Sequence, residues 1–71
     1  MLKLSARNQF SGMILEVRKG ATTTHVRIEV APNVVFTASI TNESAEELGL
    51  ATGKRAVAVV KASDVMVGIE G

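Results

Sequence analysis

The chain lacks several residue types on which specialised protein classes depend. Its 71 residues contain no cysteine, no tryptophan and no tyrosine, and the only histidine is His25. Without cysteine, neither a disulfide framework nor a thiolate metal site can form. A single isolated histidine, with no thiol and no carboxylate pair beside a polar motif, leaves no nucleophile–base pair visible. The sequence therefore predicts a protein that is not an enzyme.

Long apolar runs and a strong charge of one sign are also missing. The longest apolar runs are too short to span a bilayer, and the N-terminus has no long apolar stretch typical of a signal peptide. A cytoplasmic location is therefore the default expectation. A net charge of +1 gives no broad basic surface for nucleic acid. Hydrophobic residues nevertheless make up 46% of the chain, which excludes a disordered tail.

The length of the chain predicts one domain spanning residues 1–71. A core this small is marginal unless the fold is very regular or surface is buried against other copies. The first and third predicted strands carry apolar residues on both faces. We therefore predict that the isolated monomer is not the functional state.

The hydrophobic pattern is mainly that of β-strands. Alternation favours strands at 10–18, 23–30, 34–41 and 55–60, with a short fifth strand at 65–69. About five short strands with one brief helix after the third predict an all-β fold, a small Greek-key barrel of the OB type.

Strict alternation also predicts which side chains share a face. In the first strand it places Met13, Leu15 and Val17 on one face and Ile14 on the other. In the second strand, Val26, Ile28 and Val30 form the apolar face. In the third strand, Val34, Phe36, Ala38 and Ile40 face inward, and the apolar Val35 lies on the opposite face.

A change of period after the third strand predicts a short helix. Thr41 and its polar neighbours are N-cap candidates, and Ser44 with Glu47 also fits a capping box. Gly49 is placed to end the helix as a C′ residue.

Three polar segments accompany this pattern: Ser5-Ala6-Arg7-Asn8, Thr41-Asn42-Glu43-Ser44 and Lys61-Ala62-Ser63. Each offers hydroxyls, backbone N–H groups or a cation, which suit an oxyanion that only accepts hydrogen bonds. A helix N-terminus and the Lys61 ammonium would add favourable charge. Each segment also has a purely structural interpretation, as turn caps, helix N-caps or a lysine that protects a strand edge.

Taken together and in order, these segments, with Leu48-Gly49-Leu50 and Gly53-Lys54, resemble the molbindins, the Mop-type molybdate-binding domains, over nearly the whole chain. The resemblance implies an OB-like barrel that assembles as a hexamer, a trimer of dimers, with oxyanion sites between subunits. It implies cytoplasmic binding of molybdate, and of the similar tungstate dianion, for storage or homeostasis. Neither a metal cation nor a cofactor is implied. Arg7 and Ala62 are expected to act at least partly through their backbone N–H groups. The site residues carried over are Ser5, Arg7, Thr41, Ser44, Lys61, Ala62 and Ser63.

Two other functions fit a small barrel of this type. An OB-fold nucleic-acid binder needs a basic groove with stacking aromatics, and this chain has only Phe10 and Phe36. A structural assembly module is the other alternative, and it would differ by failing to bind anions.

Overall fold

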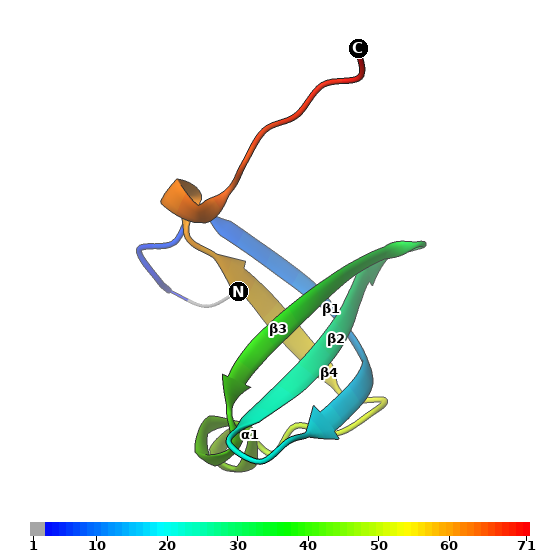
Figure 1. The fold of residues 1–71 in the computed structure, drawn as a ribbon, viewed down its shortest axis with the longest axis vertical. Helices are drawn as coiled ribbons and strands as arrows, with labels where there is room; N and C mark the ends of the chain where they lie inside the picture. The colour runs from blue at the N-terminus through cyan, green and yellow to red at the C-terminus, as the bar shows by residue number, and fades with distance from the viewer. Residues whose placement is uncertain (1–2) are drawn as a thin grey trace.

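The computed structural model describes residues 3–71 as one strongly curled antiparallel sheet with a short helix at one end (Figure 1). The sheet order is β3-β2-β1-β4, so β3 and β4 are its outermost strands. The observed bounds of the third and fourth predicted strands are the expected ones. In chain order, the elements are β1 (Asn8–Lys19), β2 (Thr23–Ala31), β3 (Val34–Thr41), α1 (Asn42–Leu48), β4 (Arg55–Val60) and the 3₁₀ turn η1 (Ala62–Asp64).

A β-bulge in β1 changes which of its residues face the core. The register with β2 shifts between Ile14 and Glu16, so Leu15 is an extra residue. As a result, Ile14 and Val17 both pack in the core, whereas Met13 and Leu15 are 37% and 38% exposed. The prediction that Met13 and Leu15 share a face with Val17 is wrong, because strict alternation contains no bulge.

The bulge also attaches the loop before β4 to the sheet. The Ile14 N–H donates to the carbonyl of Lys54 at 2.8 Å, and the Gly53 N–H donates to the carbonyl of Ile14 at 2.9 Å. Bulges bend a strand and increase its twist. This bulge therefore contributes to the curl that brings β4 round toward β3.

The core is small and lies on the concave side of the sheet. Its buried members come from β1, β2 and β4, and Val30, Phe36 and Ile40 from the predicted apolar faces of β2 and β3 pack against them. Val34 lies at the start of β3, next to the turn at Pro32 and Asn33, and is exposed. The buried core cluster consists of Ile14, Val26, Ile28 and Ala58.

The short helix begins and ends as the sequence predicts. Thr41 is the N-cap, and its side chain accepts a hydrogen bond from the Ser44 N–H. Gly49 ends the helix in the left-handed region, with φ of 62°. Since Thr41 takes the N-cap position, the alternative capping box from Ser44 to Glu47 is not used. None of the helical segments within residues 3–71 has the length and apolar character needed to cross a membrane.

The segment predicted as a fifth strand pairs with no strand in the described chain. After η1, residues 65–71 run as an extended tail away from the sheet (Figure 1). Met66, Val67 and Ile69 are each at least 90% exposed. The described chain is therefore a four-stranded, open barrel with an apolar tail.

Candidate functional site

Two of the three polar segments lie side by side at one end of the sheet. Asn8, the first residue of β1, is the register partner of Val60, the last residue of β4. The Asn8 Nδ2 group also donates to the Val60 carbonyl at 3.2 Å. Ser5-Ala6-Arg7 and Lys61-Ala62-Ser63 therefore extend from adjacent strand ends, although they are 54 or more positions apart in sequence.

The turn at Lys61-Ala62-Ser63 has backbone N–H groups that it does not use and that could donate hydrogen bonds to an anion. Its two closing hydrogen bonds run from the Asp64 N–H to the Lys61 carbonyl and from the Val65 N–H to the Ala62 carbonyl, at 2.9 and 3.3 Å. The N–H groups of Ala62 and Ser63 precede these donors, so the turn does not use them. This end of the molecule therefore offers amide donors, a hydroxyl and the exposed Lys61 ammonium.

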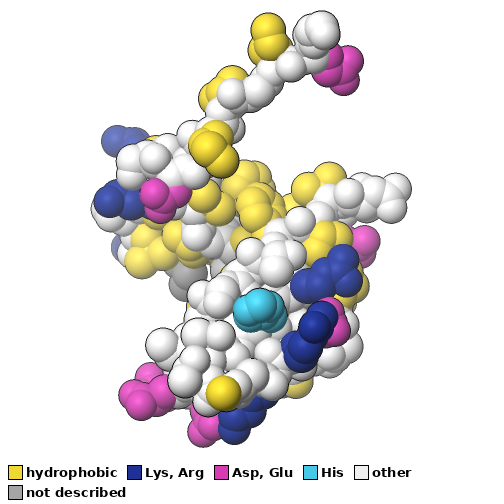
Figure 2. Space-filling view, in the orientation of Figure 1, with side chains coloured by type: hydrophobic (Ala, Val, Ile, Leu, Met, Phe, Trp, Pro, Cys, Tyr) yellow, Lys and Arg dark blue, Asp and Glu magenta, His cyan; other side chains and the backbone are white. Residues whose placement is uncertain are grey.

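The charge at this end is mixed. Figure 2 shows Lys and Arg side chains gathered near η1, with an acidic side chain beside them. Sequence and structure identify Arg7 and Lys61 as cationic residues here, and Asp64 as an acid within η1. The carboxylate of Asp64 would repel an oxyanion that came close to it.

Gln9 completes this region and carries an unsatisfied acceptor. Its Nε2 group donates to the Ala6 carbonyl at 3.2 Å, which shapes the segment before β1. Its Oε1 atom is buried and has no hydrogen-bond partner among residues 3–71. A buried acceptor is costly unless a protein group or a water molecule donates to it.

The third polar segment lies at the opposite end of the molecule. Thr41 pairs with Thr23 at the start of β2, close to Lys19 at the end of β1. Figure 1 shows α1 and η1 at opposite ends of the sheet. A site that combines Ser44 or Thr41 with Lys61 would therefore draw its residues from two copies of the chain.

More of the hydrogen-bonding groups at the start of α1 are already paired within the chain than the sequence indicates. The Thr41 Oγ1 atom accepts from the Ser44 N–H at 3.0 Å and donates to the Ser44 hydroxyl at 2.9 Å. The Asn42 N–H donates to the Thr22 carbonyl. The Ser44 hydroxyl proton is therefore the donor that this pair can still offer to a ligand.

Asn42 has a structural role that the sequence does not reveal. Its Oδ1 atom accepts from the buried Thr24 hydroxyl, and its Nδ2 group donates to the carbonyls of Gly20 and Ala21. Asn42 thereby joins α1 to the β1–β2 turn. No sequence signal distinguishes this role from that of an ordinary N-cap candidate.

Residues of the metal-ligating types do not gather in the described part of the chain. No group of three or more His, Cys, Asp or Glu side chains that could hold a metal ion occurs among residues 3–71. His25 lies exposed on the polar face of β2.

Comparison with known proteins identifies the family. The family model of the TOBE domain matches residues 4–67. The chain belongs to the TOBE-domain family. Within it, the resemblance to the Mop-type proteins is confirmed. The chain is 36% identical to a probable molybdenum-pterin-binding protein of Haemophilus influenzae, covering 97% of this chain and all of the relative. It is 41% identical to molybdenum-pterin-binding protein 2 of Clostridium pasteurianum, covering 93% and 97% of the two chains.

Solved structures confirm the OB-type fold of this family. MopII from Clostridium pasteurianum superposes with a TM-score of 0.88 at 40% identity, covering 94% of this chain and 100% of that chain. The cytoplasmic molybdate-binding protein ModG, in a form with molybdate bound, superposes with a TM-score of 0.91 at 36% identity. That match covers 97% of this chain and 49% of ModG.

Proposed function

We propose that this protein binds molybdate reversibly, without transforming it. The observation that carries the proposal is the adjacency of Ser5-Ala6-Arg7 and Lys61-Ala62-Ser63, which gathers donors and cations at one end of the sheet. Molybdate is a tetrahedral dianion that only accepts hydrogen bonds, so such donors suit it. The similarity to the molybdenum-pterin-binding relatives and to molybdate-bound ModG supports the same ligand.

We further propose that tungstate binds at the same site and that the protein stores or buffers these anions in the cytoplasm. Tungstate has nearly the same size and charge as molybdate, so a site built from hydrogen-bond donors should barely distinguish the two. The relative ModG is described as cytoplasmic, which favours this location.

The proposed binding state is a hexamer built as a trimer of dimers, with each anion held between chains. One feature of the single chain supports sites between subunits. The Thr41–Ser44 and Lys61–Ser63 segments lie at opposite ends of one copy. In this proposal, Ser5, Arg7, Lys61, Ala62 and Ser63 of one copy meet Thr41 and Ser44 of another.

The arrangement of the aromatic residues argues against nucleic-acid binding. Phe10 and Phe36 stack on each other with ring centroids 5.1 Å apart. OB-fold proteins that bind single strands use aromatic faces as platforms for bases. Here the two rings are already partners, and neither Trp nor Tyr is present to replace them.

Native mass spectrometry tests ligand and assembly together. The protein is sprayed with and without sodium molybdate, and with sodium chloride of equal ionic strength as the control. We expect a complex of six 7.5 kDa chains that gains mass in whole molybdate units. A hexamer that gains no molybdate would indicate a structural assembly module, and a monomer that binds molybdate tightly would rule out sites between subunits.

A further inference from the structure

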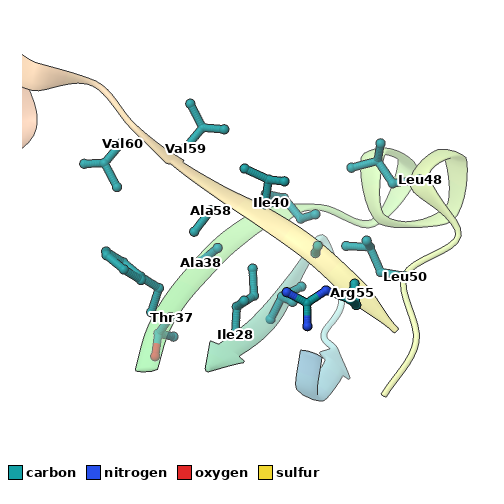
Figure 3. A pocket seen from close by; sticks show the side chains of 14 residues that line it. Ile28, Thr37, Ala38, Ile40, Leu48, Leu50, Arg55, Ala58, Val59 and Val60 are labelled. Atoms are coloured by element: carbon teal, nitrogen blue, oxygen red, sulfur yellow. The ribbon is translucent and has the colours of Figure 1, made fainter. Parts of the chain in front are cut away.

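The helix that carries Ser44 has little packing of its own. Within α1, all of whose residues the structure describes, Ala45 alone is buried. Leu48 lines the end of an apolar groove formed by β2, β3 and β4, beside Leu50 in Figure 3, and is still 69% exposed. A helix this short is not stable by itself in water. The position of α1 therefore depends on a few specific contacts.

The polar side-chain contacts made by the second half of the helix are exposed. Lys19 Nζ lies 3.4 Å from Glu46 Oε1, with the two side chains 65% and 70% exposed, and ion pairs of this kind contribute little to stability. Lys54 Nζ donates to the carbonyl of Gly49 at 3.0 Å, just after the helix ends. Neither contact reaches the first turn of α1. That turn is joined to the β1–β2 end of the sheet through Asn42.

Asn42 lies between Thr41 and Ser44 and directs all of its side-chain hydrogen bonds toward the rest of the chain. Its Oδ1 atom accepts from Thr24, and its Nδ2 group donates to two carbonyls of the β1–β2 turn, at 3.1 and 3.3 Å. A carboxamide has two N–H donors, so none is left for an anion. Asn42 therefore acts on a bound oxyanion only through its neighbours Thr41 and Ser44.

Thr24 holds the side chain of Asn42 from within the sheet. Its hydroxyl donates to Asn42 Oδ1 at 2.6 Å, and the residue is 2% exposed. Thr24 pairs with Lys19 of β1 on one side and with Ile40 of β3 on the other, so this bond ties the first residue of α1 to the paired part of the sheet. A buried hydroxyl is costly to leave without its partner, which keeps the arrangement in place. Because it is buried, Thr24 does not itself contact a ligand.

We propose that the hydrogen-bonded pair of Thr24 and Asn42 is a positioning device that makes the oxyanion site selective for molybdate over sulfate. This inference rests on the proposed function, because it concerns the donors of that same site. The pair holds Thr41 and Ser44 in place relative to the sheet, and so fixes where the Ser44 hydroxyl meets the anion. Sulfate has the same charge as molybdate on a smaller ion. A fixed set of donors rejects sulfate because its hydrogen bonds stay long, whereas a loosened set closes round it.

Two substitutions at Thr24 separate the effect of its hydroxyl from that of its shape. Thr24→Val keeps the branched side chain and removes the donor, whereas Thr24→Ser keeps the donor. Titration calorimetry with sodium molybdate and with sodium sulfate gives the ratio of the two affinities for each variant. We expect Thr24→Val to bind molybdate about tenfold more weakly, as the loss of one well-aligned hydrogen bond to the anion implies, and to bind sulfate no more weakly than the parent. Thr24→Ser should keep the parent's ratio.

A double variant distinguishes positioning from stability. Thr24→Val alone leaves Asn42 Oδ1 without its donor, but Thr24→Val/Asn42→Ala removes both partners, which can be nearly neutral for folding. Urea unfolding should therefore show the double variant to be more stable than the two single losses add up to, while its molybdate-to-sulfate ratio stays as low as that of Thr24→Val. The matched control is Ile28→Val, which removes one buried methylene from the core part of the same strand. It should lower stability and keep the parent's ratio.

The outcomes separate this positioning role from the proposed function. A folded Thr24→Val variant with the parent's molybdate affinity and ratio would overturn the positioning role, and so would a double variant that regains the parent's ratio. An equal fall of the ratio in Ile28→Val would also overturn it, because lower stability would then explain the effect. A parent that binds no molybdate would overturn the proposed function, and this inference with it. Circular dichroism checks folding, and if Thr24→Val does not fold, the double variant decides.

Discussion

The Thr24 hydroxyl donates a 2.6 Å hydrogen bond to the Asn42 Oδ1 atom and so joins β2 to the first residue of α1. Thr24 is only 2% exposed, which makes it a buried hydroxyl whose partner matters. The amide of Asn42 also donates to the Gly20 and Ala21 carbonyls at 3.1 and 3.3 Å. One side chain thereby fixes the turn, the strand and the helix start that carries Ser44.

We predict that Asn42→Ala destabilises the fold. The substitution leaves the Thr24 hydroxyl buried without its acceptor, and such a loss costs about 1–3 kcal/mol. Asn42→Asp keeps the acceptor and loses only the two amide donors, so its cost should be smaller. Urea unfolding measures both, with the exposed neighbour Glu43→Ala as the control. Equal stability of Asn42→Ala and the parent would contradict this role.

Gly12 is predicted to tolerate no side chain. A Cβ atom at this position would lie 2.4 Å from the Glu29 carbonyl oxygen and 2.9 Å from Cγ2 of Ile28. Relief of such contacts requires the β1–β2 pairing to shift, and overpacking of this kind costs about 1–3 kcal/mol. Thermal unfolding should therefore show a lower midpoint for Gly12→Ala. Gly71→Ala, where no atom lies within 4 Å, serves as the control.

Local patterns predicted most of this fold correctly. The bounds of β3 and β4 follow from alternation, and the ends of α1 follow from the chemistry of Thr41 and Gly49. These features depend on neighbours within a few positions. The bulge at Leu15 was not predictable in this way, because it depends on bonds between Ile14 and the distant Gly53-Lys54 loop.

The sequence predicted which segments form the candidate site, but not how these segments lie relative to one another. Sequence chemistry identified donor-rich segments, and the pairing of Asn8 with Val60 explains why two of them meet. Sequence chemistry could not indicate that Thr41 and Ser44 lie at the opposite end of the folded molecule. That separation follows from the antiparallel course of β1, β2 and β3, which only the fold specifies. The predicted fifth strand at 65–69 does not form in the described chain, where these residues follow η1 without pairing to the sheet.

Anion selectivity is the third prediction. Sulfate has the same acceptor geometry as molybdate on a smaller ion, so a site spaced for molybdate would leave its hydrogen bonds long. Phosphate is partly protonated near neutral pH and would place a donor against donors. Such mismatches cost about 1–3 kcal/mol each. In calorimetric competition, tungstate should displace molybdate, whereas sulfate and phosphate should compete poorly. Displacement by sulfate at a similar concentration would contradict a site of this size.

The last prediction concerns Lys61, which is exposed at the end of β4 next to the amides of Ala62 and Ser63, and these donate to no backbone carbonyl within residues 3–71. If its ammonium contacts the anion, Lys61→Ala removes a charge-assisted hydrogen bond worth about 1.5–3 kcal/mol. Titration calorimetry should then show affinity for molybdate reduced by about tenfold to a hundredfold. Lys61→Arg should restore binding only in part, because a planar guanidinium does not replace a compact ammonium.

The matched control for Lys61 is Lys54, which carries the same charge elsewhere in the fold. Its ammonium donates to the Gly49 carbonyl at 3.0 Å, at the C-terminal end of α1. Lys54→Ala removes one unit of charge and this exposed bond, and we expect little change in molybdate affinity. Native mass spectrometry must show the same assembly for both variants, so that affinity alone is compared. If Lys61 contacts the anion, Lys61→Ala must bind molybdate more weakly than Lys54→Ala. An equal loss of molybdate affinity in the two variants would indicate general electrostatic attraction and no specific contact.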